Sequence, residues 1–145
     1  MKPHHCIDIC NGLLRGERSA VETYDDAIDK FGNQSAAVEL SRIREEHARA
    51  VMTLEQNVRS MGGQPDTDSG AWGALAGAVQ KAASLLGTNS ALEALQAGEK
   101  SGKKSYETAL ADEEVMPQCK NMIQSTLLPS VNEHIQTLER LQAAA

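Results

Sequence analysis

The sequence has few aromatic residues: one Trp, two Tyr and one Phe make up 3% of its 145 residues. The core must therefore be built from aliphatic side chains, and the many Ala, Leu, Glu, Gln and Lys residues favour helices. With 41% hydrophobic and 23% charged residues, the composition is typical of a globular protein. The length fits a single domain over residues 1–145.

An excess of positive charge is also missing. The formal net charge is −6, with 14 Lys and Arg residues against 20 Asp and Glu, which argues against binding to a nucleic-acid backbone. No stretch reaches the roughly 18 apolar residues of a membrane span, and the N-terminus lacks the apolar segment of a signal peptide. We therefore expect a soluble, cytoplasmic protein without nucleic-acid or membrane partners.

Cysteines are too few for a disulfide framework, since the sequence has only Cys6, Cys10 and Cys119. This suits a reducing compartment. The tract His4, His5, Cys6 and Cys10 offers soft-metal ligands, but no second CxxC-like half completes a set of four. The simpler interpretation is a helix start with two small buried thiols. The GxSxG, Walker and Rossmann signatures are absent from the sequence.

Apolar residues spaced three and four apart predict an all-α protein with four long helices. The predicted helices cover about Pro3–Phe31, about Ser35–Met61, about Ser90–Asp112, and a segment that starts between Glu113 and Pro117 and runs toward the C-terminus. A capping box of Ser90 and Glu93 marks the start of the third. Pro129 should kink the fourth, because it removes the hydrogen bond to the carbonyl of Ser125.

Connection lengths predict how these helices are arranged. Short links join the first helix to the second and the third to the fourth, so each of these two pairs forms an antiparallel hairpin. The long passage between the hairpins can cross the bundle, which gives an up-down-down-up four-helix bundle. Within this passage, the apolar segment 71–87 predicts a short extra helix between the second and third helices.

The sequence contains an internal repeat. "GERSAVETYDDAI" starts at Gly16, and "GEKSGKKSYETAL" starts 82 positions later at Gly98. Continuing the apolar stripe of each helix places Glu17 and Glu99 inward. By the same count, His47 and His134 point inward from the second and fourth helices. The chain therefore reads as a duplicated hairpin, and each copy supplies one buried Glu and one buried His.

Four such groups near the middle of their helices can share one layer of the bundle. A lone buried carboxylate costs several kcal/mol unless it is paired, protonated or bound to a cation. Two carboxylates and two imidazoles are therefore a plausible metal cage. Tyr24 and Tyr106 lie two turns beyond the glutamates, about 10 Å along the axis, so we expect them to bond to the ligands rather than to the metal.

The chain resembles the ferritin-like superfamily. The resemblance rests on the segments "GERSAVETY", "REEHARAV", "GEKSGKKSYETAL" and "NEHIQTLERL", together with the break "MGGQPD". Within this superfamily, the chain resembles a bacterial four-helix-bundle family listed as a domain of unknown function. The resemblance implies a ferritin-like fold and, in di-iron members, a Glu on helices one and three and Glu-x-x-His on helices two and four. Glu17, His47, Glu99 and His134 match four of the six positions, but Arg44 and Val131 occupy the other two.

Glu46 and Glu133 directly precede the histidines. They are expected to be solvated flank charges, with a substitute ligand role as the alternative. The first functional hypothesis is a metal-binding ferritin-like protein involved in oxidative or metal stress, with iron as the first choice and zinc or manganese as alternatives. Oxidase or peroxidase-like chemistry would follow only if a coordination position stays open. The second hypothesis is a metal-free helical stress or interaction protein with a structural Glu-His layer. The sequence is compatible with a homodimer but does not specify one.

Overall fold

A computed structural model of the chain describes residues 3–31, 35–68 and 88–144. In these residues every regular element is helical and none is a strand, so the prediction of an all-α bundle is confirmed. The elements are α1 (Pro3–Phe31), α2 (Ser35–Ser60), α4 (Thr88–Ala111), α5 (Pro117–Met122), the π-helix η1 (Ile123–Leu127) and α6 (Leu128–Ala144). The extra helix predicted over 71–87 lies outside the described residues.

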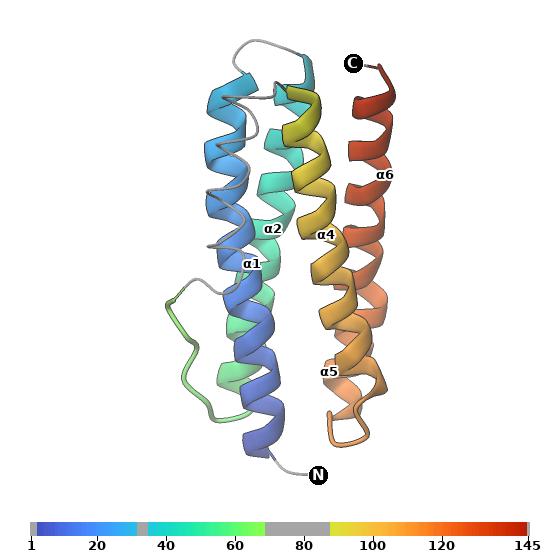
Figure 1. The fold of residues 1–145 in the computed structure, drawn as a ribbon. Helices are drawn as coiled ribbons and strands as arrows, with labels where there is room; N and C mark the ends of the chain where they lie inside the picture. Colours follow the sequence, from blue (N-terminus) through green and yellow to red (C-terminus); the bar gives the residue numbers. More distant parts are fainter. Residues whose placement is uncertain (1–2, 32–34, 69–87, 145) are drawn as a thin grey trace.

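The helices form two hairpins that stand side by side (Figure 1). α1 packs mainly on α2, and α4 packs mainly on the rod of α5, η1 and α6. α1 and α6 run upward in the view of Figure 1, whereas α2 and α4 run downward. Each helix therefore lies antiparallel to its hairpin partner, and the first and last helices share one direction.

The fourth rod begins at Pro117, which occupies the first helical turn where its missing N–H costs nothing. Before Pro129 the chain widens into the π-helix η1, in which the Leu128 N–H bonds to the carbonyl of Ile123. The expected interruption at Pro129 thus takes the form of a π-helical turn, a feature that inserts an extra residue into a helix. The third helix begins at Thr88 rather than Ser90, so Ser90 lies within its first turn and not at its start.

Two aliphatic clusters fill the bundle interior. One is built around Tyr24, Phe31, Leu40, Ile43, Leu92, Leu95 and Leu138, and the other around Leu13, Leu14, Leu54, Tyr106, Ile123 and Leu127. Full burial of each large aliphatic side chain contributes about 1.5–3 kcal/mol. Along every long helix, the inward polar residue lies between members of these clusters, so the clusters position a polar layer near the middle of the bundle.

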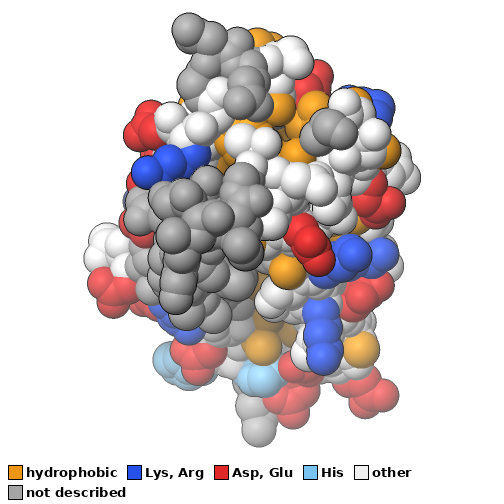
Figure 2. Space-filling view, turned by 45° about the horizontal axis from the view of Figure 1, so that its top comes forward, with side chains coloured by type: hydrophobic (Ala, Val, Ile, Leu, Met, Phe, Trp, Pro, Cys, Tyr) orange, Lys and Arg blue, Asp and Glu red, His pale blue; other side chains and the backbone are white. Residues whose placement is uncertain are grey.

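Among the described helices, none combines the length and apolar character needed to cross a membrane. On the face drawn in Figure 2, acidic and basic side chains are mixed rather than gathered into one basic patch. Two large apolar side chains, Val38 and Met52, are exposed on α2.

Candidate metal centre

The four residues singled out by the repeat lie together in the interior. Glu17 is on α1, His47 on α2, Glu99 on α4 and His134 on α6, and they are 6%, 3%, 1% and 1% exposed. Since each helix buries one apolar stripe, a polar residue on that stripe is largely removed from water. Four groups that would each be costly to bury alone are therefore buried against one another.

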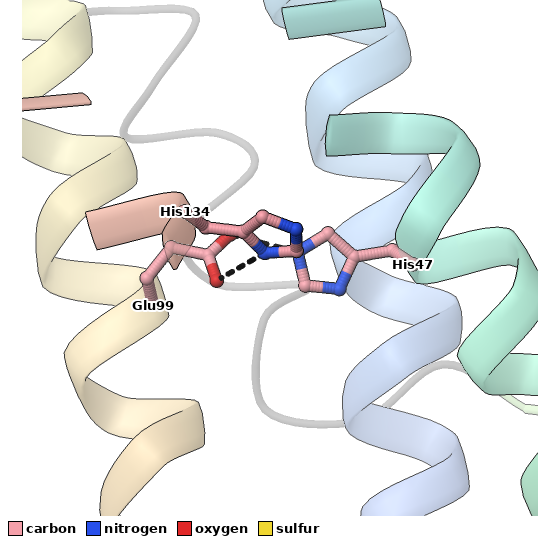
Figure 3. Close-up of side chains that lie close together, drawn as sticks. All are labelled: His47, Glu99 and His134. Atoms are coloured by element: carbon pink, nitrogen blue, oxygen red, sulfur yellow. Dashed lines mark hydrogen bonds and ion pairs between the residues drawn. The ribbon is translucent and has the colours of Figure 1, made fainter. Parts of the chain in front are cut away.

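Glu99 bonds to both imidazoles, and the three side chains lie close together (Figure 3). Its Oε2 accepts a hydrogen bond from His47 Nε2 at 2.7 Å, and its Oε1 accepts one from His134 Nδ1 at 3.2 Å. The two imidazole centroids are 4.7 Å apart. One ligand atom from each of the three residues lies within 4.8 Å of the other two, so this buried His-Glu-His group could hold a metal ion.

A second carboxylate holds the far nitrogen of each imidazole. Glu17 Oε2 accepts from His47 Nδ1 at 2.5 Å, and Glu46 Oε1 accepts from His134 Nε2 at 2.7 Å. A carboxylate in this position fixes the ring orientation of a metal-binding histidine and raises its basicity. Glu17 is predicted from the sequence as a metal ligand, but in the structure it bonds to His47 Nδ1, whereas Glu99 bonds to His47 Nε2. Glu46, expected as a solvated charge, reaches the layer, with its side chain 23% exposed.

Tyr24 and Tyr106 are buried and bond to the glutamate of the other hairpin. Tyr24 Oη donates to Glu99 Oε2 at 2.5 Å, and Tyr106 Oη donates to Glu17 Oε1 at 2.6 Å. Burial, reinforced by the neighbouring carboxylates, raises the pKa of both tyrosines well above the ordinary value. Both hydroxyls therefore remain protonated donors, and they tie the two hairpins together at the level of the polar layer.

The layer favours the ionised forms of His47, Glu99 and Glu46. Burial by itself would lower the pKa of His47, but the carboxylates of Glu99 and Glu17 outweigh it and raise that pKa well above its ordinary value. Burial would also raise the pKa of Glu99, but His47 and His134 outweigh it and hold that pKa well below its usual range. The pKa of Glu46 is lowered in the same way, because His134 and Arg42 outweigh its partial burial.

Two pockets reach the layer from different sides. The larger, of about 390 Å³, is lined by α2 and the η1–α6 rod, including Glu46, His47, Thr53, Ser125, Thr126, Pro129, Ser130 and His134. The smaller, of about 210 Å³, is lined by α1 and α4, including Gly12, Gly16, Glu17, Glu99, Gly102 and Tyr106. At Gly16 and Gly102, a Cβ would meet no atom within 4 Å, so missing side chains help to open this second pocket.

The two remaining positions of the di-iron pattern do not contribute carboxylates. Arg44 pairs with Asp25 at 2.9 Å near the surface, and Val131 is buried in the apolar core. The Glu133 side chain is 60% exposed and accepts from Arg42 at 3.0 Å, so it does not substitute for them. The buried group that does meet, His47, Glu99 and His134, could hold a metal ion without these two positions.

Ser130 and Arg42 also belong to the site, although the sequence reasoning missed them. Ser130 Oγ lies 3.3 Å from both His134 Nε2 and Glu46 Oε1, and Arg42 donates to the other Glu46 oxygen at 2.8 Å. The available signal was a break in the repeat. Four residues before its histidine, the first hairpin has the buried Ile43, whereas the second has a serine.

In a comparison with protein families, a family model matches residues 5–112, which is more than half of the chain. The family is described as "Domain of unknown function (DUF2383)". The chain belongs to this family. The matched region of the DUF2383 protein holds Glu17, His47 and Glu99, whereas His134 lies beyond it. No curated protein and no solved structure matches the chain.

Proposed function

We propose that this DUF2383 protein is a metal-binding, ferritin-like bundle protein whose ligands are His47, Glu99 and His134. The observation that carries the proposal is the convergence of these three buried side chains on one position. A buried carboxylate flanked by two imidazoles from other helices is a set of donors that a divalent cation can bridge.

The donor set favours iron. Two histidines and one carboxylate that leave coordination positions open are the ligand set of non-haem Fe(II) sites, and such a set also suits zinc and manganese. The larger pocket reaches both histidines, so a small molecule has room to approach. When bound there, Fe(II) with an open position would supply binding and activation of O₂ or peroxide, which is the basis for a role in oxidative or metal stress.

The surroundings fit a metal ion because they already contain the groups that orient its ligands. Glu17 and Glu46 hold the outer nitrogens of the two imidazoles, and Tyr24 donates to Glu99. The inner nitrogens, His47 Nε2 and His134 Nδ1, hydrogen-bond to Glu99. A divalent cation bound to these nitrogens would take the place of the protons that they carry there, so metal binding would release protons.

The ferritin-like assignment is part of the proposal. It is supported by the helix directions, in which the first and last helices run opposite to the middle two (Figure 1). It is also supported by inward Glu and His residues on alternate helices. The missing carboxylates at Arg44 and Val131 favour one metal ion over the bridged pair of di-iron members.

The competing function is a metal-free structural layer, and one observation favours it. Every nitrogen of His47 and His134 already bonds to a carboxylate, and in the described part of the chain only Ser19 Oγ is a buried side-chain polar atom without a partner. A fully bonded polar network can fix the register of a bundle without any ligand.

Elemental analysis separates the two functions. Protein purified after growth with iron should carry about one metal ion per chain, and Glu99→Gln, which keeps the shape but removes the central charge, should lose it. Glu133→Gln is the matched control, because its carboxylate is exposed and outside the layer. Wild-type protein that binds no metal, and whose unfolding is unchanged by added Fe²⁺, Mn²⁺ or Zn²⁺, would instead support the structural layer.

A further inference from the structure

Three sulfur atoms from distant segments meet at the end of the bundle that holds the start of α1. Cys10 on α1 and Cys119 on α5 bring their Sγ atoms to 3.8 Å, although they are 109 positions apart in the sequence. Met61, directly after α2, places its Sδ 3.9 Å from Cys119 Sγ. This cluster, Cys10–Cys119–Met61, lies in a separate apolar cluster with Val58 and Val115.

The environment of the cluster is apolar but not sealed. Cys10 and Cys119 are 1% and 0% exposed, and both are free thiols. Met61 is only partly buried, so it forms the side of the cluster nearest to water. The sulfur separation of 3.8 Å is far beyond the roughly 2.05 Å of a disulfide bond, so the structure presents two separate donors.

Asn57 organises the two cysteines. Its Nδ2 group donates to both Sγ atoms at 3.1 Å. Amide hydrogen bonds of this kind stabilise sulfur that carries negative charge and orient it as a ligand. The hydrogen bond from the Cys10 thiol, with the help of Asn57, lowers the pKa of Cys119 to about 6 despite its burial, whereas the same contact and burial raise the pKa of Cys10 well above its ordinary value.

We propose that Cys10, Cys119 and Met61 form a binding site for one soft monovalent ion, Cu(I), distinct from the His-Glu-His centre. Two sulfurs bound to a metal at about 2.3 Å each lie about 3.8 Å apart in tetrahedral geometry and about 4.0 Å apart in trigonal geometry. The observed separations of 3.8 and 3.9 Å fall in this range. Cu(I) prefers two thiolates and a thioether, whereas the oxygen and nitrogen donors of the polar layer suit harder cations.

The test is an anaerobic titration of the reduced, metal-free full-length protein with Cu(I) in competition with a coloured Cu(I) chelator. Wild-type protein should bind one Cu(I) per chain and gain thiolate-to-copper absorption in the ultraviolet. Cys10→Ala and Cys119→Ala should each abolish stoichiometric binding. Met61→Leu, which keeps the size of the side chain and both thiols, should weaken binding by about tenfold.

The chain offers two matched controls. Cys6→Ala also removes a buried cysteine of α1, but this thiol donates to the carbonyl of Glu114, so Cu(I) binding should persist. Glu99→Gln should keep Cu(I) binding even if it loses a divalent metal, which separates this site from the polar layer. Circular dichroism checks that every variant is folded. If a cysteine variant is unfolded, the Cu(I) affinity of Met61→Leu tests the proposal in its place.

Three results would overturn the proposal. The first is wild-type protein that leaves Cu(I) with the chelator. The second is a Met61→Leu variant that binds as tightly as wild type. The third is mild oxidation that joins Cys10 to Cys119 in a disulfide, detected by mass, in a protein whose reduced form takes up no Cu(I).

Discussion

The two hairpins carry the same Glu, Tyr and His repeat, yet they hold their histidines differently. His47 bonds at both nitrogens to carboxylates that are almost fully buried, Glu17 and Glu99. His134 bonds to Glu99 on one side, but on the other it meets the partly exposed Glu46 beside the larger pocket. Both histidines line the larger pocket, but only His134 has a partly exposed carboxylate as a partner.

Residues at equivalent positions of the two repeats therefore do not occupy equivalent positions in the bundle. Glu46 and Glu133 each precede a histidine, but only Glu46 reaches the layer. Arg42 contacts both, donating to Glu46 at 2.8 Å and to Glu133 at 3.0 Å, and the second hairpin has Pro129 at the corresponding position. The π-helical turn before Pro129 lines the larger pocket, so this part of the second copy shapes one wall of the opening to the site.

Replacing each histidine in turn should give the largest contrast. In metal-free protein, His47→Gln should cost roughly 3–5 kcal/mol of unfolding free energy, because it removes the cationic partner that two buried carboxylates share. His134→Gln should cost about 1–3 kcal/mol, because Glu46 can turn to water. Urea unfolding measures both. Equal losses from the two variants would contradict the distinction between a histidine with two buried carboxylate partners and one with a partly exposed partner.

The tyrosines separate stability from metal binding. Tyr24→Phe and Tyr106→Phe each remove one hydroxyl donated to a buried carboxylate, so each should cost about 1.5–3 kcal/mol. Only Tyr24 bonds to Glu99, the proposed ligand, so Tyr24→Phe should change metal affinity more than Tyr106→Phe. Isothermal titration with Zn²⁺ provides the comparison, and a larger effect from Tyr106→Phe would assign the metal to Glu17 instead.

The pH dependence of the metal-free protein should have two limbs. The folded pKa of Glu99 lies below its ordinary 4.5, so its contribution is present above that value and is lost as the pH falls. The folded pKa of His47 lies above its ordinary 6.5, so its contribution is complete below 6.5 and is lost as the pH rises through the raised value.

Stability from these two groups should therefore be greatest between 4.5 and 6.5, whereas metal affinity should rise with pH because binding releases protons. Thermal unfolding across pH, with and without Zn²⁺, checks both statements. His47→Gln is the control, since it should flatten the alkaline limb. An unchanged alkaline limb in that variant would assign the effect to another group.

The smallest contrast concerns the two flanking glutamates. Glu46→Gln should weaken metal binding by about tenfold, because it removes the carboxylate that orients His134. Glu133→Gln should leave metal binding unchanged, since this exposed side chain only contacts Arg42. A competition assay with a metal-sensitive dye suffices. Indistinguishable affinities in the two variants would show that the asymmetry around Glu46 has no functional consequence.

Much of the fold could be predicted because it rests on local rules. The spacing of apolar residues and the positions of Gly and Pro predicted the helices to within a few residues. The apolar stripe of each helix placed Glu17, His47, Glu99 and His134 in the interior. The partners of each group depend on helix rotation and side-chain reach across the bundle, which one helix's pattern does not contain. For this reason the crossed tyrosine bonds, the role of Glu46 and the meeting of Cys10 with Cys119 emerged only from the structure.

The central claim is that the buried carboxylate of Glu99, with the two histidines beside it, holds a metal ion. Anomalous X-ray diffraction from crystals grown with Fe²⁺, recorded on both sides of the iron absorption edge, tests it directly. The account predicts one strong peak within bonding distance of His47 Nε2, a Glu99 oxygen and His134 Nδ1. Well-ordered side chains in this layer with no peak among them, or a peak only elsewhere in the molecule, would contradict it.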